Sequence, residues 1–173
     1  MELSAAVKGR RSIRSYKPND VSEEEVEVLI EAATFAPSAG NIQPWEFIVV
    51  RNPEMKKKLA IAANEQLFMA QAPVVIVVCA NEILSSQGYG LRGKTLFCLQ
   101  DTAAAVENML LTAYSLGLGT CWIGAFEEIE VREALRIPEG VRPVALVPVG
   151  YPAKIGVSRP KRSMEQIVHR EIF

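Results

Sequence analysis

The apolar run from Ala72 to Ala80 constrains the fold of this 173-residue chain more than any other segment. From Val74 onward it is rich in β-branched residues and has no polar position, so neither face of a strand formed here suits contact with water. The run is far short of the ~20 residues that a membrane-spanning helix needs. The sequence therefore predicts a central strand whose sheet is covered by helices on both faces, and no membrane partner.

Other elements are predicted on either side of this strand. Ser22 and Glu25 form a capping-box pattern, and Asn52-Pro53 is a typical helix start. A helix that ends at Gly117 has the strongest apolar stripe. The predicted helices cover residues 2–8, 22–33, 52–63, 101–116 and 128–135, and further strands cover 47–50, 120–123 and 144–149. Residues 82–98, which contain three glycines, are expected to be irregular, and Pro148 predicts an edge position or a bulge.

This order of elements predicts one domain, residues 1–173, of the α/β or α+β class. The tail from Tyr151 onward has little core of its own. Ser163 and Gln166 suggest a second capping box and a last helical turn there.

Composition excludes several classes of function. The net charge of −1 and the pI of about 6.0 give no basic field for nucleic acid. One histidine and three separated cysteines, without a Cys-x-x-Cys pair, leave a zinc site short of ligands. Free thiols suit a reducing compartment, and the first residues lack the pattern of a signal peptide. We therefore expect a cytoplasmic protein with no metal.

Residues 88–95 match the phosphate-binding pattern G-x-x-x-x-G-K-[ST]. In a true P-loop, backbone amides would cradle phosphates, Lys94 would reach the outer ones and Thr95 would hold magnesium. However, seven residues separate the predicted strand from Gly88, and no later strand ends in an acid. The favoured interpretation is a surface loop with Lys94 in solvent, and a P-loop nucleotide-binding protein remains the alternative.

Three further segments suggest a binding site. Arg10 to Tyr16 holds three arginines and a serine, whose donors suit phosphate oxygens, although a solvated basic turn has the same composition. The segment 36–47 combines prolines, Gly40 and small or amide side chains that allow close approach to a flat ligand, or simply turn from helix to strand. The segment 117–126 places Gly124 after a strand, where packing alone is the other explanation.

Taken together, these segments resemble the nitroreductase family of FMN-dependent oxidoreductases over nearly the whole chain. The most specific motifs are R-R-S-x-R-x-Y from Arg10 and A-P-S-x-x-N-x-Q-P-W from Ala36. The resemblance implies an α+β fold with a central mixed or antiparallel sheet flanked by helices. It also implies a homodimer in which the C-terminal arm embraces the partner, with FMN bound between the two chains.

The resemblance assigns the ends of the FMN to different residues. For the phosphate and ribityl chain it implies Arg10, Arg11, Ser12, Arg159 and Lys161, with Arg162 able to replace either of the last two. For the ring it implies Arg14 near the pyrimidine edge, and Asn64, Ile123 and Gly124. From the partner subunit it implies the segment with Pro37, Ser38, Ala39 and Asn41.

The implied reaction passes a hydride from NADH or NADPH through flavin N5 to a nitroaromatic or a quinone, by a ping-pong mechanism. The flavin carries the chemistry, so no catalytic side chain is expected. A non-catalytic flavin-binding dimer is an alternative, as are other reductions on the same fold. Leu67 and Ser163 depart from residues common in the family, and the segment 83–94, in a region that helps to shape the substrate pocket of the family, resembles no recognised motif. The acceptor and the choice of nicotinamide are therefore left open.

Overall fold

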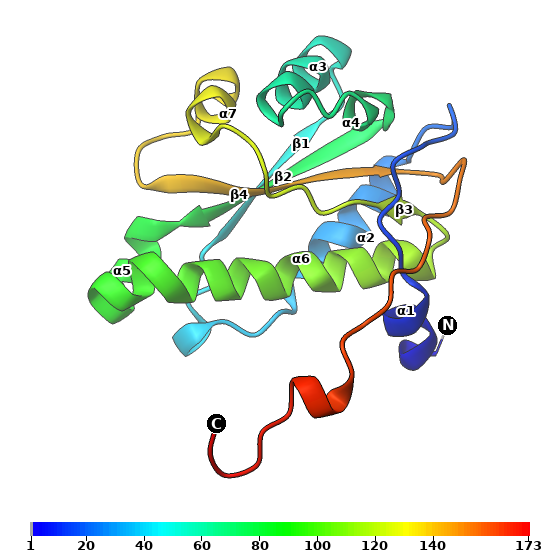
Figure 1. The fold of residues 1–173 in the computed structure, drawn as a ribbon. Coiled ribbons are helices and arrows are strands. Elements are labelled where there is room, and N and C mark those ends of the chain that lie inside the picture. The colour runs from blue at the N-terminus through cyan, green and yellow to red at the C-terminus, as the bar shows by residue number, and fades with distance from the viewer. Residues whose placement is uncertain (1) are drawn as a thin grey trace.

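A four-stranded antiparallel sheet forms the centre of the molecule, whose computed structural model describes residues 2–173 (Figure 1). The strands are β1 (Trp45–Val50), β2 (Val74–Asn81), β3 (Gly119–Thr120) and β4 (Val141–Gly150), in the spatial order β1-β2-β4-β3. An isolated parallel bridge joins Ser12 to Thr120 at the β3 edge. The fold is therefore α+β, as predicted.

Strand β2 lies inside the sheet, and residues Val74 to Ala80 have no exposed surface. On one face Val74, Ile76 and Val78 pack against α2 (Glu23–Thr34) and α6 (Cys98–Ser115). On the other face Val75, Val77 and Cys79 pack with α3 (Pro53–Ala62) and α7 (Glu128–Leu135). Figure 1 shows these two helical layers on opposite sides of the strands. The prediction of a strand covered on both faces is confirmed.

Side-chain caps begin the helices at the predicted residues. Ser22 Oγ accepts from the Glu25 N–H at 3.2 Å, and Glu25 Oε2 accepts from the Ser22 N–H at 2.8 Å. Asn52 Oδ1 accepts from the Met55 N–H at 2.9 Å. Within residues 2–173, no helix has both the length and the apolar character required to cross a bilayer.

Residues 82–98 are helical, so the expectation of an irregular segment is wrong. They form α5 (Glu82–Arg92), kinked at Tyr89 and Gly90, and the π-helix η2 (Gly93–Phe97), which continues into α6. Gly88 and Gly93 serve close packing, against Ile42 and the Ser85 carbonyl oxygen, whereas Gly90 has open space around it and a φ of 53° at the kink. The short helix α4 (Phe68–Gln71) was also not predicted.

Pro148 occupies neither an edge nor a bulge, because β4 lies between β2 and β3. Leu146 exchanges both backbone hydrogen bonds with Ile123, at 2.9 and 3.0 Å. The nitrogen of Pro148, two residues later, faces the same side of β4 as the Leu146 N–H. The proline is tolerated there because β3 is only two residues long and does not pair with it. The register shift in the pairing of β2 with β4 lies at Val78/Cys79 of β2 instead.

The two ends of the chain are the least buried parts. The N-terminal helix α1 (Leu3–Gly9) lies beside α6, and residues 157–173 are exposed throughout. In Figure 1 this tail leaves the body of the molecule. Its only helical turn is η3 (Met164–Gln166), where Gln166 Oε1 accepts from the Ser163 N–H at 3.1 Å. The tail has little core of its own, as predicted.

Candidate functional site

The arginine-rich segment that follows α1 is held in an extended form between β3 and the start of the tail. The Ile13 N–H donates to the Thr120 carbonyl at 2.8 Å, and the Ala153 N–H donates to the Ser15 carbonyl at 2.9 Å. Tyr16 Oη donates to the Ile13 carbonyl at 2.9 Å, and burial raises the pKa of Tyr16 so that the phenol keeps its proton. These bonds fix the backbone from which the arginines project.

A cleft of about 400 Å³ opens between this segment and the tail. Five of its lining residues are cationic and none is acidic. The complete lining consists of Arg10, Arg11, Ser12, Arg14, Gly156, Val157, Ser158, Arg159 and Lys161. Gly156 permits the close approach of the two segments, since a Cβ there would lie 2.6 Å from the Ser12 carbonyl oxygen. The structure thus brings together all the residues predicted to contact a phosphate, and the charge of the cleft suits an anion.

Arg11 differs from the other cations of this cleft. Its Nη1 donates to the carbonyl oxygens of Lys8 at 2.6 Å and Arg10 at 2.8 Å. These contacts satisfy carbonyls at the C-terminal end of α1. Part of the guanidinium is therefore engaged in capping. Arg10 Nε lies 3.9 Å from Glu107 Oε1, which leaves Arg159 and Lys161 as the freer donors toward an anion.

Arg14 marks the other end of the extended segment. Its guanidinium carbon lies 5.9 Å from the centroid of the Phe68 ring, within cation–π range. Burial raises the pKa of the neighbouring Cys121 thiol, and the positive charge of Arg14 opposes that shift. Phe68 was missed by the sequence analysis because α4 was not predicted; its aromatic ring a few residues after Asn64 was the available signal.

Asn64 and the end of the 117–126 segment meet on this side of the molecule. Asn64 Nδ2 and Gln66 Nε2 both donate to the Ala125 carbonyl, at 3.3 and 3.4 Å. The N–H of Ile123 is used in the bridge to β4, whereas Gly124 is exposed and its N–H donates to no residue in the described range 2–173. Of the two predicted backbone contacts, only Gly124 therefore has a free donor. Gln66 had not been predicted.

The remaining predicted residues lie far from the cleft, in the loop that includes η1 (Ala39–Asn41). The Ala39 N–H donates to Asp101 Oδ1 at 3.1 Å in the first turn of α6, whereas Gly9 lies against Tyr114 near the other end of that helix. At 1.5 Å per residue, the two contacts are about 20 Å apart along the helix axis. Figure 1 shows this loop and α1 near opposite ends of α6. One chain alone does not bring these four residues to the cleft: Pro37, Ser38, Ala39 and Asn41.

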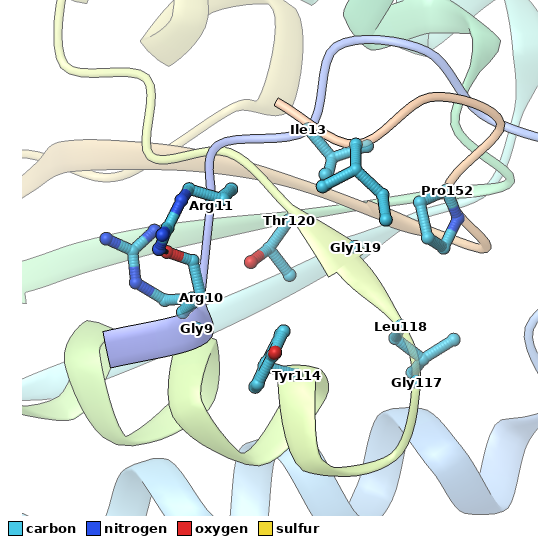
Figure 2. A pocket seen from close by; sticks show the side chains of 11 residues that line it. Gly9, Arg10, Arg11, Ile13, Tyr114, Gly117, Leu118, Gly119, Thr120 and Pro152 are labelled. Atoms are coloured by element: carbon cyan, nitrogen blue, oxygen red, sulfur yellow. Dashed lines mark hydrogen bonds between the residues drawn. The ribbon is translucent and has the colours of Figure 1, made fainter. Parts of the chain in front are cut away.

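A second, smaller pocket of about 140 Å³ shares Arg10 and Arg11 with the cleft (Figure 2). Ile13 from the extended segment, Tyr114 from α6 and Pro152 from the tail surround it. Its lining is largely apolar, so the charged cleft is the stronger candidate for an anionic group.

Comparison with known proteins assigns the chain to a family. The model of the nitroreductase family matches residues 7–68 and 60–151. The chain belongs to the nitroreductase family. The resemblance found in its sequence motifs is thereby confirmed.

Several relatives of this nitroreductase-family chain match along most of its length. An Archaeoglobus fulgidus protein with the provisional name NADH dehydrogenase/NAD(P)H nitroreductase is 44% identical over 147 residues, which cover 83% of this chain and 81% of that protein. A Bacillus subtilis FMN reductase [NAD(P)H] is 31% identical over 99% of this chain and 74% of its own length. Among solved structures, B. megaterium NfrA2 superimposes with a TM-score of 0.92 at 31% identity, covering all of this chain and 76% of that one.

The P-loop-like motif does not form a phosphate-binding loop in this nitroreductase-family chain. Gly88 to Thr95 lies in α5 and η2, where most backbone amides are used by the helices. Lys94 Nζ lies 3.7 Å from Glu82, and Thr95 Oγ1 donates to the Leu91 carbonyl at 2.9 Å. The segment is helical, which corrects the expectation of a loop, but it lies at the surface as expected: Gly93 is its only buried residue, and the Lys94 side chain is 53% exposed.

Proposed function

We propose that this chain is an FMN-dependent NAD(P)H oxidoreductase that reduces electron-poor acceptors such as nitroaromatics or quinones. Family membership and relatives named as FMN reductases and NAD(P)H nitroreductases support an NAD(P)H-dependent flavin oxidoreductase. The observation that carries the proposal for this chain is the cleft lined by five cations and no acid.

The cleft fits the phosphate end of FMN. Arg10, Arg159 and Lys161 supply guanidinium and ammonium donors, and the Ser12 hydroxyl adds a neutral one. A phosphate carries a charge of about −1.5 to −2 near neutral pH, so several converging cations hold it by charge-assisted hydrogen bonds. The tail contributes two of these cations, which makes binding depend on its path past Ser12.

The residues beyond the cleft suit the ring end. FMN, when bound, supplies the transfer of a hydride from a nicotinamide to an acceptor. In this proposal Arg14, which also lines the cleft, would offset negative charge on the pyrimidine side, Gly124 would offer its N–H, and Asn64, whose Nδ2 donates to the Ala125 carbonyl, would add an amide. Positive charge and oriented donors of this kind stabilise the more anionic state of a bound group. We further propose that nicotinamide and acceptor use the same open face in turn.

We propose that the site is completed in a homodimer. A folded monomer of this mass exposes about 8,400 Å², whereas the described chain exposes 10351 Å². Much of the excess is apolar: Val157, Ile172 and Phe173 in the tail, and Phe35 at the end of α2, are largely exposed. A second copy would cover these surfaces and bring its own 37–41 loop to the cleft that one chain leaves incomplete.

The whole of residues 1–173 is proposed to act as one FMN-binding domain. All three cysteines are buried and unpaired in the described range. This is consistent with the proposed location in the cytoplasm, where thiols stay reduced.

The decisive experiment is the visible spectrum of the purified protein, followed by NADH or NADPH without oxygen. The proposal predicts flavin absorption that bleaches with one equivalent of nicotinamide and returns on addition of a quinone. A yellow protein that does not bleach would indicate the non-catalytic flavin-binding dimer. A colourless protein that takes up no added FMN would contradict the proposal.

The assignment of the cleft is tested by the double variant Arg159→Ala/Lys161→Ala. Its FMN affinity should fall at least tenfold, because two of the cleft's cations are removed. The control Lys57→Ala/Lys58→Ala removes the same charge from the exposed side of α3. Equal losses in both variants would show that only net charge matters and that the cleft is not the site.

A further inference from the structure

Asp101 is a buried acid that the proposed chemistry does not use. It lies in the first turn of α6 and is only 6% exposed. Its Oδ1 accepts from the Ala39 N–H at 3.1 Å, and this is the single hydrogen bond of the carboxylate within residues 2–173. The second oxygen, Oδ2, is buried without a partner in the same range.

This arrangement does not favour stability. A buried carboxylate oxygen without a donor loses the hydration that it had in the unfolded chain. Burial accordingly raises the pKa of Asp101. The one favourable contact of the carboxylate is its hydrogen bond with the N–H of Ala39, which is the first residue of η1.

The loop held by Asp101 has an unusual backbone. Gly40, Asn41 and Gln43 all have positive φ, at 56°, 57° and 55°. For the two residues that are not glycine this conformation is sparsely populated and persists only where the surroundings enforce it. Within the loop, the Gln43 N–H donates to Ser38 Oγ at 3.0 Å.

Two helices hold this loop in place. The hydroxyl of Tyr89 in α5 would lie 2.7 Å from a Cβ on Gly40, so the ring packs on the loop backbone. Asp101 in α6 supplies the only side-chain hydrogen bond to the loop from another described element. The Tyr89 ring packs on the loop without a directional bond, whereas the hydrogen bond to the Asp101 carboxylate fixes the position of the Ala39 N–H.

We propose that Asp101 is a positioning residue for the reaction. Through the Ala39 N–H it sets the conformation in which the 38–41 segment is presented to the cofactor site of a second copy. The inference rests on the proposed function, because it requires that loop to lie over the partner's FMN. It predicts that the loop's geometry, and with it the acceptor site, depends on an acceptor atom at position 101.

Three variants separate the hydrogen bond from the charge and from general damage to α6. Asp101→Leu removes the acceptor at similar size, and Asp101→Asn keeps an oxygen that can accept from Ala39. Asn108→Leu is the matched control, because it removes another hydrogen bond from α6, the one from Nδ2 to the Ala32 carbonyl at 3.1 Å. Amide hydrogen exchange over residues 36–44 reads the loop directly, with or without FMN.

In Asp101→Leu the Ala39 amide should exchange at least tenfold faster, and the KM for 1,4-benzoquinone should rise at least threefold with a smaller change in kcat. Affinity of the cleft for inorganic phosphate should not change. Asp101→Asn and Asn108→Leu should match the unmodified chain in all three measurements. If Asp101→Leu fails to fold, Ala39→Pro removes the donor instead, at a site where Ser38 is already extended (φ −138°, ψ 153°) as a residue before proline prefers.

The outcomes distinguish this inference from the proposed function. An unmodified protein that binds no FMN contradicts the proposed function, whatever the exchange data show. An FMN-loaded protein in which Asp101→Leu keeps slow exchange and an unchanged KM overturns the inference alone. So does an Asp101→Asn variant that behaves like Asp101→Leu, because the charge rather than the hydrogen bond would then be the cause.

Discussion

Replacing Gly156 by alanine tests whether the path of the tail shapes the cleft. An added Cβ would lie 2.6 Å from the Ser12 carbonyl oxygen, where ordinary contacts begin at 3.4 Å. The two backbones must therefore move apart by about 0.8 Å, because the obstacle is backbone and not the flexible end of a side chain. Arg159 and Lys161 follow Gly156 along the tail and move with it.

The expected loss follows from the hydrogen bonds that this movement lengthens. One hydrogen bond to a charged group contributes about 1.5–3 kcal/mol, so losing one phosphate contact weakens FMN binding by about 10- to 150-fold. Titration of FMN fluorescence gives the dissociation constant. Folding should be unaffected, because residues 157–173 are exposed and belong to neither main core.

The control is Lys154→Ala, which changes an exposed residue just before Gly156 without entering the cleft. It should bind FMN as the unmodified chain does, and urea unfolding should give the same midpoint for all three proteins. A Gly156→Ala variant with a dissociation constant within twofold of the unmodified chain would refute the idea that close apposition of the tail and Ser12 forms the site.

Three further predictions follow from the structure. The thiol reagent DTNB at pH 8 should label the native chain slowly, and should label all three thiols in urea. Burial raises the pKa of each thiol in the folded chain, that of Cys79 to about 12. Rapid labelling of the native chain would contradict the burial of Cys79, Cys98 and Cys121. Lys56 Nζ donates to the Ala72 carbonyl at 2.6 Å, and its pKa is lowered by burial. The unfolded chain therefore binds this proton more tightly, so stability should rise with pH from the folded pKa up to about 10.4. Lys56→Met should flatten this rise in urea titrations, and an unchanged slope would show that another group causes it. A chain that ends at Gly156 should keep the far-ultraviolet circular dichroism of the sheet and helices. It should sediment as a monomer and show no FMN absorbance, because the tail is proposed to complete both the dimer and the cleft. A yellow dimer without the tail would contradict the proposed role of the tail.

Local patterns in the sequence were sufficient for much of the fold. The buried strand from Val74, the capping box at Ser22 and the stop at Gly117 depend on residues close together in the chain, so their signals are local. The helical segment 82–97 was mispredicted because its glycines were taken for loop residues. Gly93 serves a contact with Ser85 that exists only once the helices have packed.

For the candidate site too, some features were predicted from the sequence and others appeared only in the folded structure. The motif from Arg10 to Tyr16 and the basic tail residues were assigned to the site through their resemblance to the family, because arginines alone would equally suit a solvated basic turn. That they face one another across a cleft depends on backbone bonds between segments more than 130 residues apart, such as that from Ala153 to Ser15. The distance of the 37–41 loop from that cleft, and its hold by Asp101, likewise came only from the packing along α6. Residue types determined which chemistry is available to this protein, and tertiary contacts decided where its parts lie, because the positions of distant segments are set by the packing of a common core.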